Sequence, residues 1–185
     1  MDEEMEGIAV EQMMMERVAA SVQDFHLPRY HEIPDVGLYL EQVTKYINDA
    51  LSPLMQAALT GSMVSNYVKK GLVASPVKKQ YSREQIAYLI YIAVVKSVLP
   101  MEDIRLMVSV QQKTYTAEKA YNYFCAELEN VLSTVFERRS ELVSVGIENT
   151  DEKTMLRNTI ITVAHKVYLD KLFAALRAQE EAKNA

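Results

Sequence analysis

The chain has 185 residues, 49% of them hydrophobic and 24% charged, which is typical of a folded protein and excludes a disordered chain. Five glycines and five prolines are too few for a turn-rich β-sandwich or barrel, so we expect long helices. The formal net charge of −5, taken alone, disfavours nucleic acid as a partner.

The composition also bears on the cellular compartment. No apolar run reaches the length of a membrane span. The sequence opens with Met1-Asp2-Glu3-Glu4, which is acidic where a secretory signal has a basic region. Cys125 is the only cysteine, which excludes an internal disulfide framework and fits a reducing environment. We therefore expect a cytoplasmic protein without membrane contact.

The first predicted element is an acidic helix over residues 3–23. Six acidic side chains lie within residues 2–16, and apolar residues from Met5 to Val18 recur at loose helical spacing. Residues 24–37 contain two prolines and are expected to form an extended connector.

A helix over residues 36–51 is expected next. Its apolar residues repeat at steps of three and four from Leu40 to Leu51, and Asp35 is its expected N-cap. A short turn after Ser52-Pro53 then leads to the following helix.

This following helix has two distinct faces. The break Thr60-Gly61-Ser62 precedes it, with Ser62 as the expected N-cap, and Gly71 ends it. Its apolar face comprises Met63, Val64, Tyr67 and Val68. Its polar face comprises Ser62, Ser65, Asn66 and Lys69.

Residues 72–81 are predicted to form a small β-hairpin, or wing, around Ser75-Pro76. Ser82 and Gln85 form a capping box that begins a helix over residues 83–98. This helix is apolar on nearly every side, which predicts a place at the centre of the domain.

The remaining elements are a short helix over residues 101–110 and two long helices over residues 117–144 and 151–179. Both long helices carry apolar stripes. Because the loop expected between them, residues 146–150, is short, we predict an antiparallel helical hairpin.

Acidic residues are absent between Asp49 and Glu84. These 34 residues carry a charge of +5, which leaves −10 for the rest of the chain. The five cations are Lys69, Lys70, Lys78, Lys79 and Arg83. Lysine pairs alone also fit an ordinary solvated surface, but their position around a polar-faced helix and a wing favours nucleic-acid binding.

A short helix with such a polar face suits the major groove of DNA. Asparagine can pair bidentately with adenine, serine can contact base edges, and lysines neutralise phosphates. We assign Ser62, Ser65, Asn66 and Lys69 to the groove. We assign Lys70, Lys78, Lys79, Tyr81 and Arg83 to the phosphates.

Two resemblances involve the same residues. Residues 63–73 read Met-Val-Ser-Asn-Tyr-Val-Lys-Lys-Gly-Leu-Val and resemble the second helix of MerR-like winged helix-turn-helix regulators. Residues 76–81, 86–92 and 99–104 are similar to the wing, the core helix and the following short helix of that fold. The turn before the polar-faced helix is longer here than in MerR-like proteins. No effector-binding cysteine cluster follows, so metal sensing is not implied.

The bacterial family called domain of unknown function 1836 is a closer match. Four segments resemble it: Leu27-Pro28-Arg29-Tyr30, Leu38 to Val43, Met63 to Gly71 and Lys78 to Ser82. The resemblance covers about residues 25–110. It implies a bacterial transcription regulator whose target and effector ligand are undefined.

The sequence carries little that points to catalysis. His26, His31 and His165 have no accompanying cluster of metal ligands. Cys125 lies in an apolar stripe, which predicts a buried side chain and not a nucleophile. No glycine-rich phosphate loop, nucleophile elbow or paired-carboxylate motif is present. We expect no enzyme, no metal and no cofactor. The tyrosines expected at the edge of the core, with hydroxyls reaching water, are Tyr88, Tyr91, Tyr121 and Tyr123.

Together these observations predict an all-α protein with a MerR-like winged helix-turn-helix domain, a small β wing and a C-terminal helical hairpin. The expected divisions are an acidic helix at 1–24, a DNA-binding domain at 25–112 and a dimerisation hairpin at 113–185. The predicted function is transcription regulation by a homodimer on double-stranded DNA. The alternative is a non-catalytic protein-interaction module that keeps the fold without binding DNA, which the acidic remainder and the Met-rich first helix favour.

Overall fold

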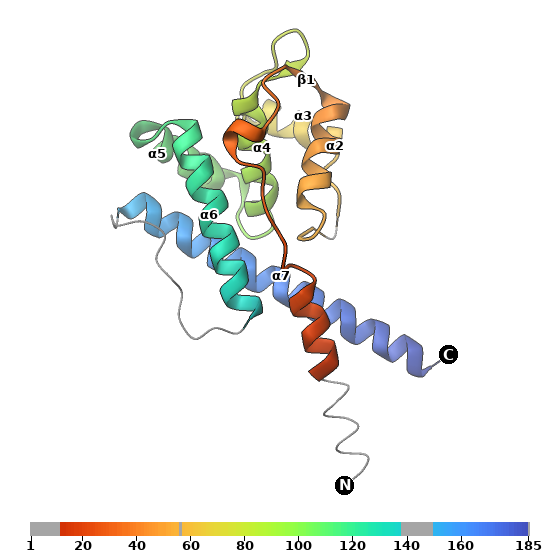
Figure 1. Cartoon of the computed structure of the whole chain (residues 1–185). Coiled ribbons are helices and arrows are strands. Elements are labelled where there is room, and N and C mark those ends of the chain that lie inside the picture. Colours follow the sequence, from red (N-terminus) through yellow and green to blue (C-terminus); the bar gives the residue numbers. More distant parts are fainter. Residues whose placement is uncertain (1–11, 56, 138–149, 185) are drawn as a thin grey trace.

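The computed structural model describes residues 12–55, 57–137 and 150–184, and the regular structure among them is helical apart from one small sheet (Figure 1). The all-α class is therefore confirmed. Residues 12–20 are helical, in agreement with the predicted first helix, whose residues 3–11 lie outside the described part. Within the described residues, no helix is both long and apolar enough to span a bilayer.

The elements follow one another in a nearly continuous series. The first half contains a 3-10 turn η1 (Tyr30–Glu32), β1 (Leu38–Tyr39), α2 (Leu40–Leu51), α3 (Gly61–Lys69), β2 (Gln80–Tyr81) and α4 (Arg83–Val95). The second half contains α5 (Met101–Thr114), α6 (Ala117–Phe136) and α7 (Asp151–Lys183).

Helix α4 lies at the centre, as its apolar pattern predicts. Its buried residues occupy all sides of the helix, and α2, α6 and α7 pack around it. The predicted capping box is also confirmed. The Ser82 hydroxyl accepts from the Gln85 amide at 3.4 Å, while the Gln85 side chain accepts from the Ser82 amide at 2.8 Å.

Helix α2 begins four residues later than predicted. Residues 38 and 39 are extended because they pair antiparallel with Tyr81 and Gln80 of β2. Gly37 permits this close approach, since a Cβ there would lie 2.8 Å from the Gln80 Cβ. The N-cap assigned to Asp35 is therefore wrong, and Tyr39 occupies that position.

The connector of residues 24–33 forms a strap along α6 (Figure 1). The Glu129 carboxylate accepts from the Leu27 amide at 2.9 Å and from both terminal nitrogens of Arg29 at 2.7 and 2.6 Å. The Asn122 side chain accepts from the Tyr30 amide at 2.9 Å. The strap therefore joins the start of the predicted DNA-binding domain to a helix beyond its predicted end at residue 112.

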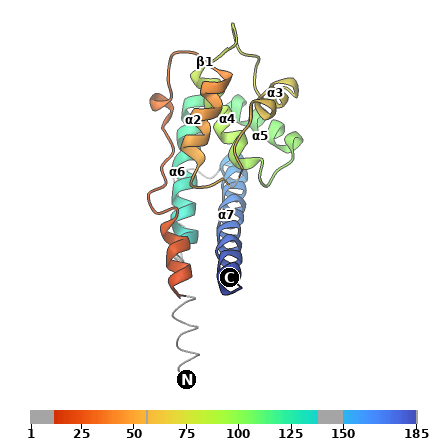
Figure 2. The same cartoon turned by 90° about the vertical axis from the view of Figure 1, so that its right-hand side faces the viewer.

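Helices α6 and α7 cross obliquely and run in the same general direction (Figure 1), so the predicted antiparallel hairpin is wrong. Partners on the two helices advance together along the sequence: Tyr123 with Lys153, Glu127 with Arg157 and Phe136 with Tyr168. Figure 2 shows both helices descending from their N-termini.

Helix α6 was predicted to run to residue 144 and ends at Phe136 in the described part of the chain. The predicted residues 138–144 lie outside the described residues.

Candidate nucleic-acid interface

The polar face predicted for α3 is exposed. Ser62, Ser65, Asn66 and Lys69 are all solvent-exposed, while Val64 and Tyr67 on the opposite face are buried in the core. The helix has an N-cap different from the predicted one. Thr60, not Ser62, caps it, because the Thr60 hydroxyl accepts from the Met63 amide at 3.2 Å. The Ser62 side chain thus stays available on the surface.

Both ends of α3 are held in place. Before the helix, the Asn48 side chain donates to the Leu59 carbonyl at 3.0 Å and accepts from the Leu59 amide at 2.7 Å. After it, Gly71 adopts a φ of 71°, and the Arg105 guanidinium of α5 donates to the Lys70 carbonyl. This arginine was missed in the sequence, where nothing relates it to α3.

The wing contains a tight turn at Lys78-Lys79 and not, as predicted, at Ser75-Pro76. Val77 and Gln80 exchange two backbone hydrogen bonds of 3.1 and 2.9 Å across the turn. The two lysines between them have φ values of 50° and 66°, a region that favours glycine and asparagine. Figures 1 and 2 show this loop projecting beyond β1.

Four lysines form an unpaired basic group around these two elements. All four are exposed, and none has an ion-pair partner within the described ranges. They are Lys69 and Lys70 at the end of α3 and Lys78 and Lys79 at the wing turn. Elsewhere Lys45 pairs with Asp49 at 2.7 Å, so carboxylates neutralise other lysines of this chain.

The structure engages Tyr81 and Arg83, both assigned to phosphates, within the protein. Tyr81 belongs to β2 and is 4% exposed, and burial raises the pKa of its hydroxyl. Arg83 is held within the protein: its Nε donates to the Ile33 carbonyl at 2.8 Å, and its guanidinium lies 3.7 Å from Asp35 and over the Tyr30 ring. Strand pairing buries Tyr81, and residues 30–35 of the connector hold Arg83.

Two further predictions concern groups outside this interface. Cys125 is buried as predicted, and burial raises the pKa of its thiol to about 11. Tyr121 is 5% exposed, so the prediction that its hydroxyl reaches water is wrong. No group of three His, Cys, Asp or Glu side chains in the described part of the chain is arranged to hold a metal ion.

Comparison with known proteins gives one match. A family model described as "Domain of unknown function (DUF1836)" matches residues 28–124, just over half of the chain. The match runs from the strap into α6 and so includes α3, the wing and α5. No curated protein and no solved structure matches the chain significantly.

Proposed function

We propose that this chain, which belongs to the family described as domain of unknown function (DUF1836), is a transcription regulator that binds double-stranded DNA. In this proposal α2 and α3 form the helix pair of a MerR-like winged helix-turn-helix. Helix α3 enters the major groove, and the wing turn contacts the phosphate backbone.

One observation carries the proposal: the exposed polar face of α3 ends in Lys69 and Lys70, the wing turn carries two more lysines, and none of the four has an ion-pair partner among the described residues. Ser65 and Asn66 offer hydrogen-bonding groups of the kind that read base edges. Lys69 and Lys78 supply positive charge of the kind that fixes a protein on the backbone.

The backbone of the wing turn supports the same reading. A left-handed conformation at a non-glycine residue costs about 1 kcal/mol or more, and such strain concentrates at functional sites. Lys78 and Lys79 both adopt it, although asparagine and glycine would suit the turn better. A need for charge at the tip accounts for lysine at these positions.

Salt dependence provides the test. Duplex DNA is titrated at about 50 and 200 mM salt against the wild type and the K78A/K79A variant, with K45A/K166A as the control. Each phosphate contact contributes about −0.9 to the slope of log affinity against log salt, so K78A/K79A should reduce the slope by about 1.8. Absence of measurable binding by the wild type at low salt would reject the proposal.

Base reading by Asn66 has a separate test. After selection of bound sites from random duplexes, Asn66→Ala should lose about 1–3 kcal/mol of discrimination at one base position. A preference that stays unchanged would assign Asn66 to the scaffold.

We further propose that the regulator is a homodimer joined through α7. Leu169, Phe173 and Leu176 are 45%, 50% and 36% exposed and recur at steps of four and three. They lie where α7 extends past the end of α6 (Figure 1). A twofold dimer would present two copies of α3 to a pseudo-palindromic site.

The same apolar stripe favours a second candidate function, a protein-interaction module without DNA binding. In that case the partner of α7 is a different protein, and the acidic remainder of the chain repels nucleic acid. The salt titration separates the two candidates, since only the regulator binds duplex DNA.

A further inference from the structure

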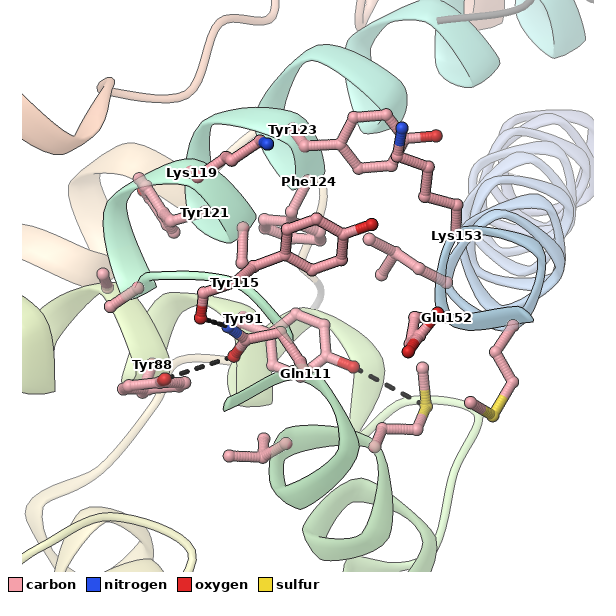
Figure 3. A pocket seen from close by; sticks show the side chains of 17 residues that line it. Tyr88, Tyr91, Gln111, Tyr115, Lys119, Tyr121, Tyr123, Phe124, Glu152 and Lys153 are labelled. Atoms are coloured by element: carbon pink, nitrogen blue, oxygen red, sulfur yellow. Dashed lines mark hydrogen bonds between the residues drawn. The ribbon is translucent and has the colours of Figure 1, made fainter. Parts of the chain in front are cut away.

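A cavity of about 210 Å³ lies between α4, α5, α6 and the first turn of α7 (Figure 3). Six aromatic side chains line it: Tyr88, Tyr91, Tyr115, Tyr121, Tyr123 and Phe124. Tyr91 and Phe124 meet edge to face with ring centroids 5.2 Å apart, so part of the wall is rigid and apolar. The cavity lies away from α3 and the wing, and the proposed DNA contacts do not use it.

The volume limits what the cavity can hold. An apolar cavity of about 150 Å³ accommodates benzene, whereas sites for drug-sized ligands measure about 300–1,000 Å³. A space of about 210 Å³ therefore suits one aromatic ring with a small substituent.

The charged groups of the cavity favour an anionic substituent. The Lys119 ammonium lies 5.2 Å from the centre of the Tyr115 ring, and the Lys153 ammonium lies 5.4 Å from that of Tyr123. Neither lysine has a carboxylate partner among the residues that the structure describes. In the view of Figure 3 both ammonium groups lie along the same edge of the cavity. An ammonium over a ring forms a weaker interaction than a charge-assisted hydrogen bond to a carboxylate.

The one acidic side chain of the lining is already engaged. The Glu152 carboxylate accepts from the Thr114 hydroxyl at 3.1 Å, and hydrogen bonds at the start of α7 lower its pKa. Two ammonium groups against one engaged carboxylate leave the cavity with a net positive charge.

We propose that this cavity binds a small aromatic carboxylic acid, with the ring against Tyr91 and Phe124 and the carboxylate between Lys119 and Lys153. The proposal goes beyond DNA binding and does not depend on it.

Calorimetric titration of the full chain, without DNA, tests the class of ligand. The probes are benzoate, its neutral analogue benzamide and its cationic analogue benzylamine. Benzoate should bind saturably, and the other two should bind at least about tenfold more weakly because they lose the charge-assisted bonds. Tighter binding of benzylamine than of benzoate, or no saturable heat with benzoate at millimolar concentration, would overturn the proposal.

Variants test the place of binding. Lys119→Met and Lys153→Met should each weaken benzoate binding about tenfold and leave benzamide binding unchanged. Lys113→Met is the matched control, because Lys113 is an exposed lysine at the end of α5 that does not line the cavity. Ala120→Leu, which fills the cavity from a partly exposed position, should weaken all three probes. An equal effect of the three lysine variants would contradict the assigned site.

Discussion

Glu127 shows how the fold acts on a single carboxyl group. The side chain is fully buried between α6 and α7, with Arg157 Nε 3.3 Å from one of its oxygens. Burial raises its pKa, and the nearby Arg157 charge opposes this effect. A raised pKa means that folding favours the protonated form. Ionising Glu127 therefore lowers the free energy of unfolding. This loss grows as the pH rises from the ordinary pKa of a glutamate to the higher pKa of Glu127 in the fold.

The variant Glu127→Gln removes this ionisation. Its free energy of unfolding, relative to that of the wild type, should be larger at pH 8 than at pH 4. The increase should be about 1.4 kcal/mol for each unit by which the pKa is raised. Urea unfolding at the two pH values measures it, with the exposed Glu180→Gln as control. An identical difference at both pH values would show that folding leaves the pKa of Glu127 unchanged.

The wing turn leads to a second prediction at the scale of single residues. Replacing Lys78 by Asn and Lys79 by Gly should raise the free energy of unfolding by about 1–2 kcal/mol, because these residues suit positive φ. The same variant should bind duplex DNA more weakly. Thermal unfolding and DNA titration measure the two effects. The K78A/K79A variant keeps the strain but removes the charge, so it should weaken binding without the gain in stability.

At the scale of elements, local patterns predicted helices well and their ends less well. The capping box at Ser82 and the all-round apolar pattern of α4 depend on residues close in sequence, so both were predictable. The start of α2 depends on pairing with Gln80 and Tyr81, some forty positions away, and no local signal marks it. Neither glycine nor proline marks the end of α6 at Phe136. The direction of α7 depends on its packing against α6, so no local pattern predicted it.

In the candidate interface too, features set by residues close in sequence were predictable, and features set by distant contacts were not. The exposed face of α3 follows from helical spacing, so Ser65 and Asn66 were placed from the sequence. The burial of Tyr81 was not predictable, because it results from strand pairing with the distant Leu38. Arg105 was missed because its contact with α3 exists only after α5 has packed.

The strap offers a test at this scale. Glu129→Ala removes three hydrogen bonds that join residues 24–33 to α6, two of them from the partly buried Arg29. We expect a loss of about 2–3 kcal/mol in the free energy of unfolding, measured in urea. Asp49→Ala breaks the exposed pair with Lys45 and should cost less than about 0.5 kcal/mol. Equal losses in the two variants would mean that the strap adds nothing beyond a surface ion pair.

For the whole molecule, the charge of −5 combines two unlike regions. The 34 residues from 50 to 83 carry +5 and include α3 and the wing, while the rest of the chain carries −10. Under the proposed function, this separation orients the protein toward DNA through one face and limits non-specific adhesion of the others.

The oligomeric state is a prediction at the same scale. Light scattering at micromolar concentration should give the mass of a dimer for the wild type and of a monomer for Phe173→Glu. The introduced glutamate should leave the free energy of unfolding of the monomer unchanged, since Phe173 is half exposed within one chain. Leu106→Glu changes a side chain of α5 that is 60% exposed and serves as control. A wild type that scatters as a monomer would reject dimerisation through α7.

The strap also determines the order in which the protein is completed during synthesis. Leu27 and Arg29 find their partner Glu129 about a hundred residues later, so a nascent chain carries the strap unattached until α6 has been translated. Helix α4 likewise stays partly uncovered until α6 and α7 arrive. The first half of the chain therefore completes its packing only after the second half has been synthesised.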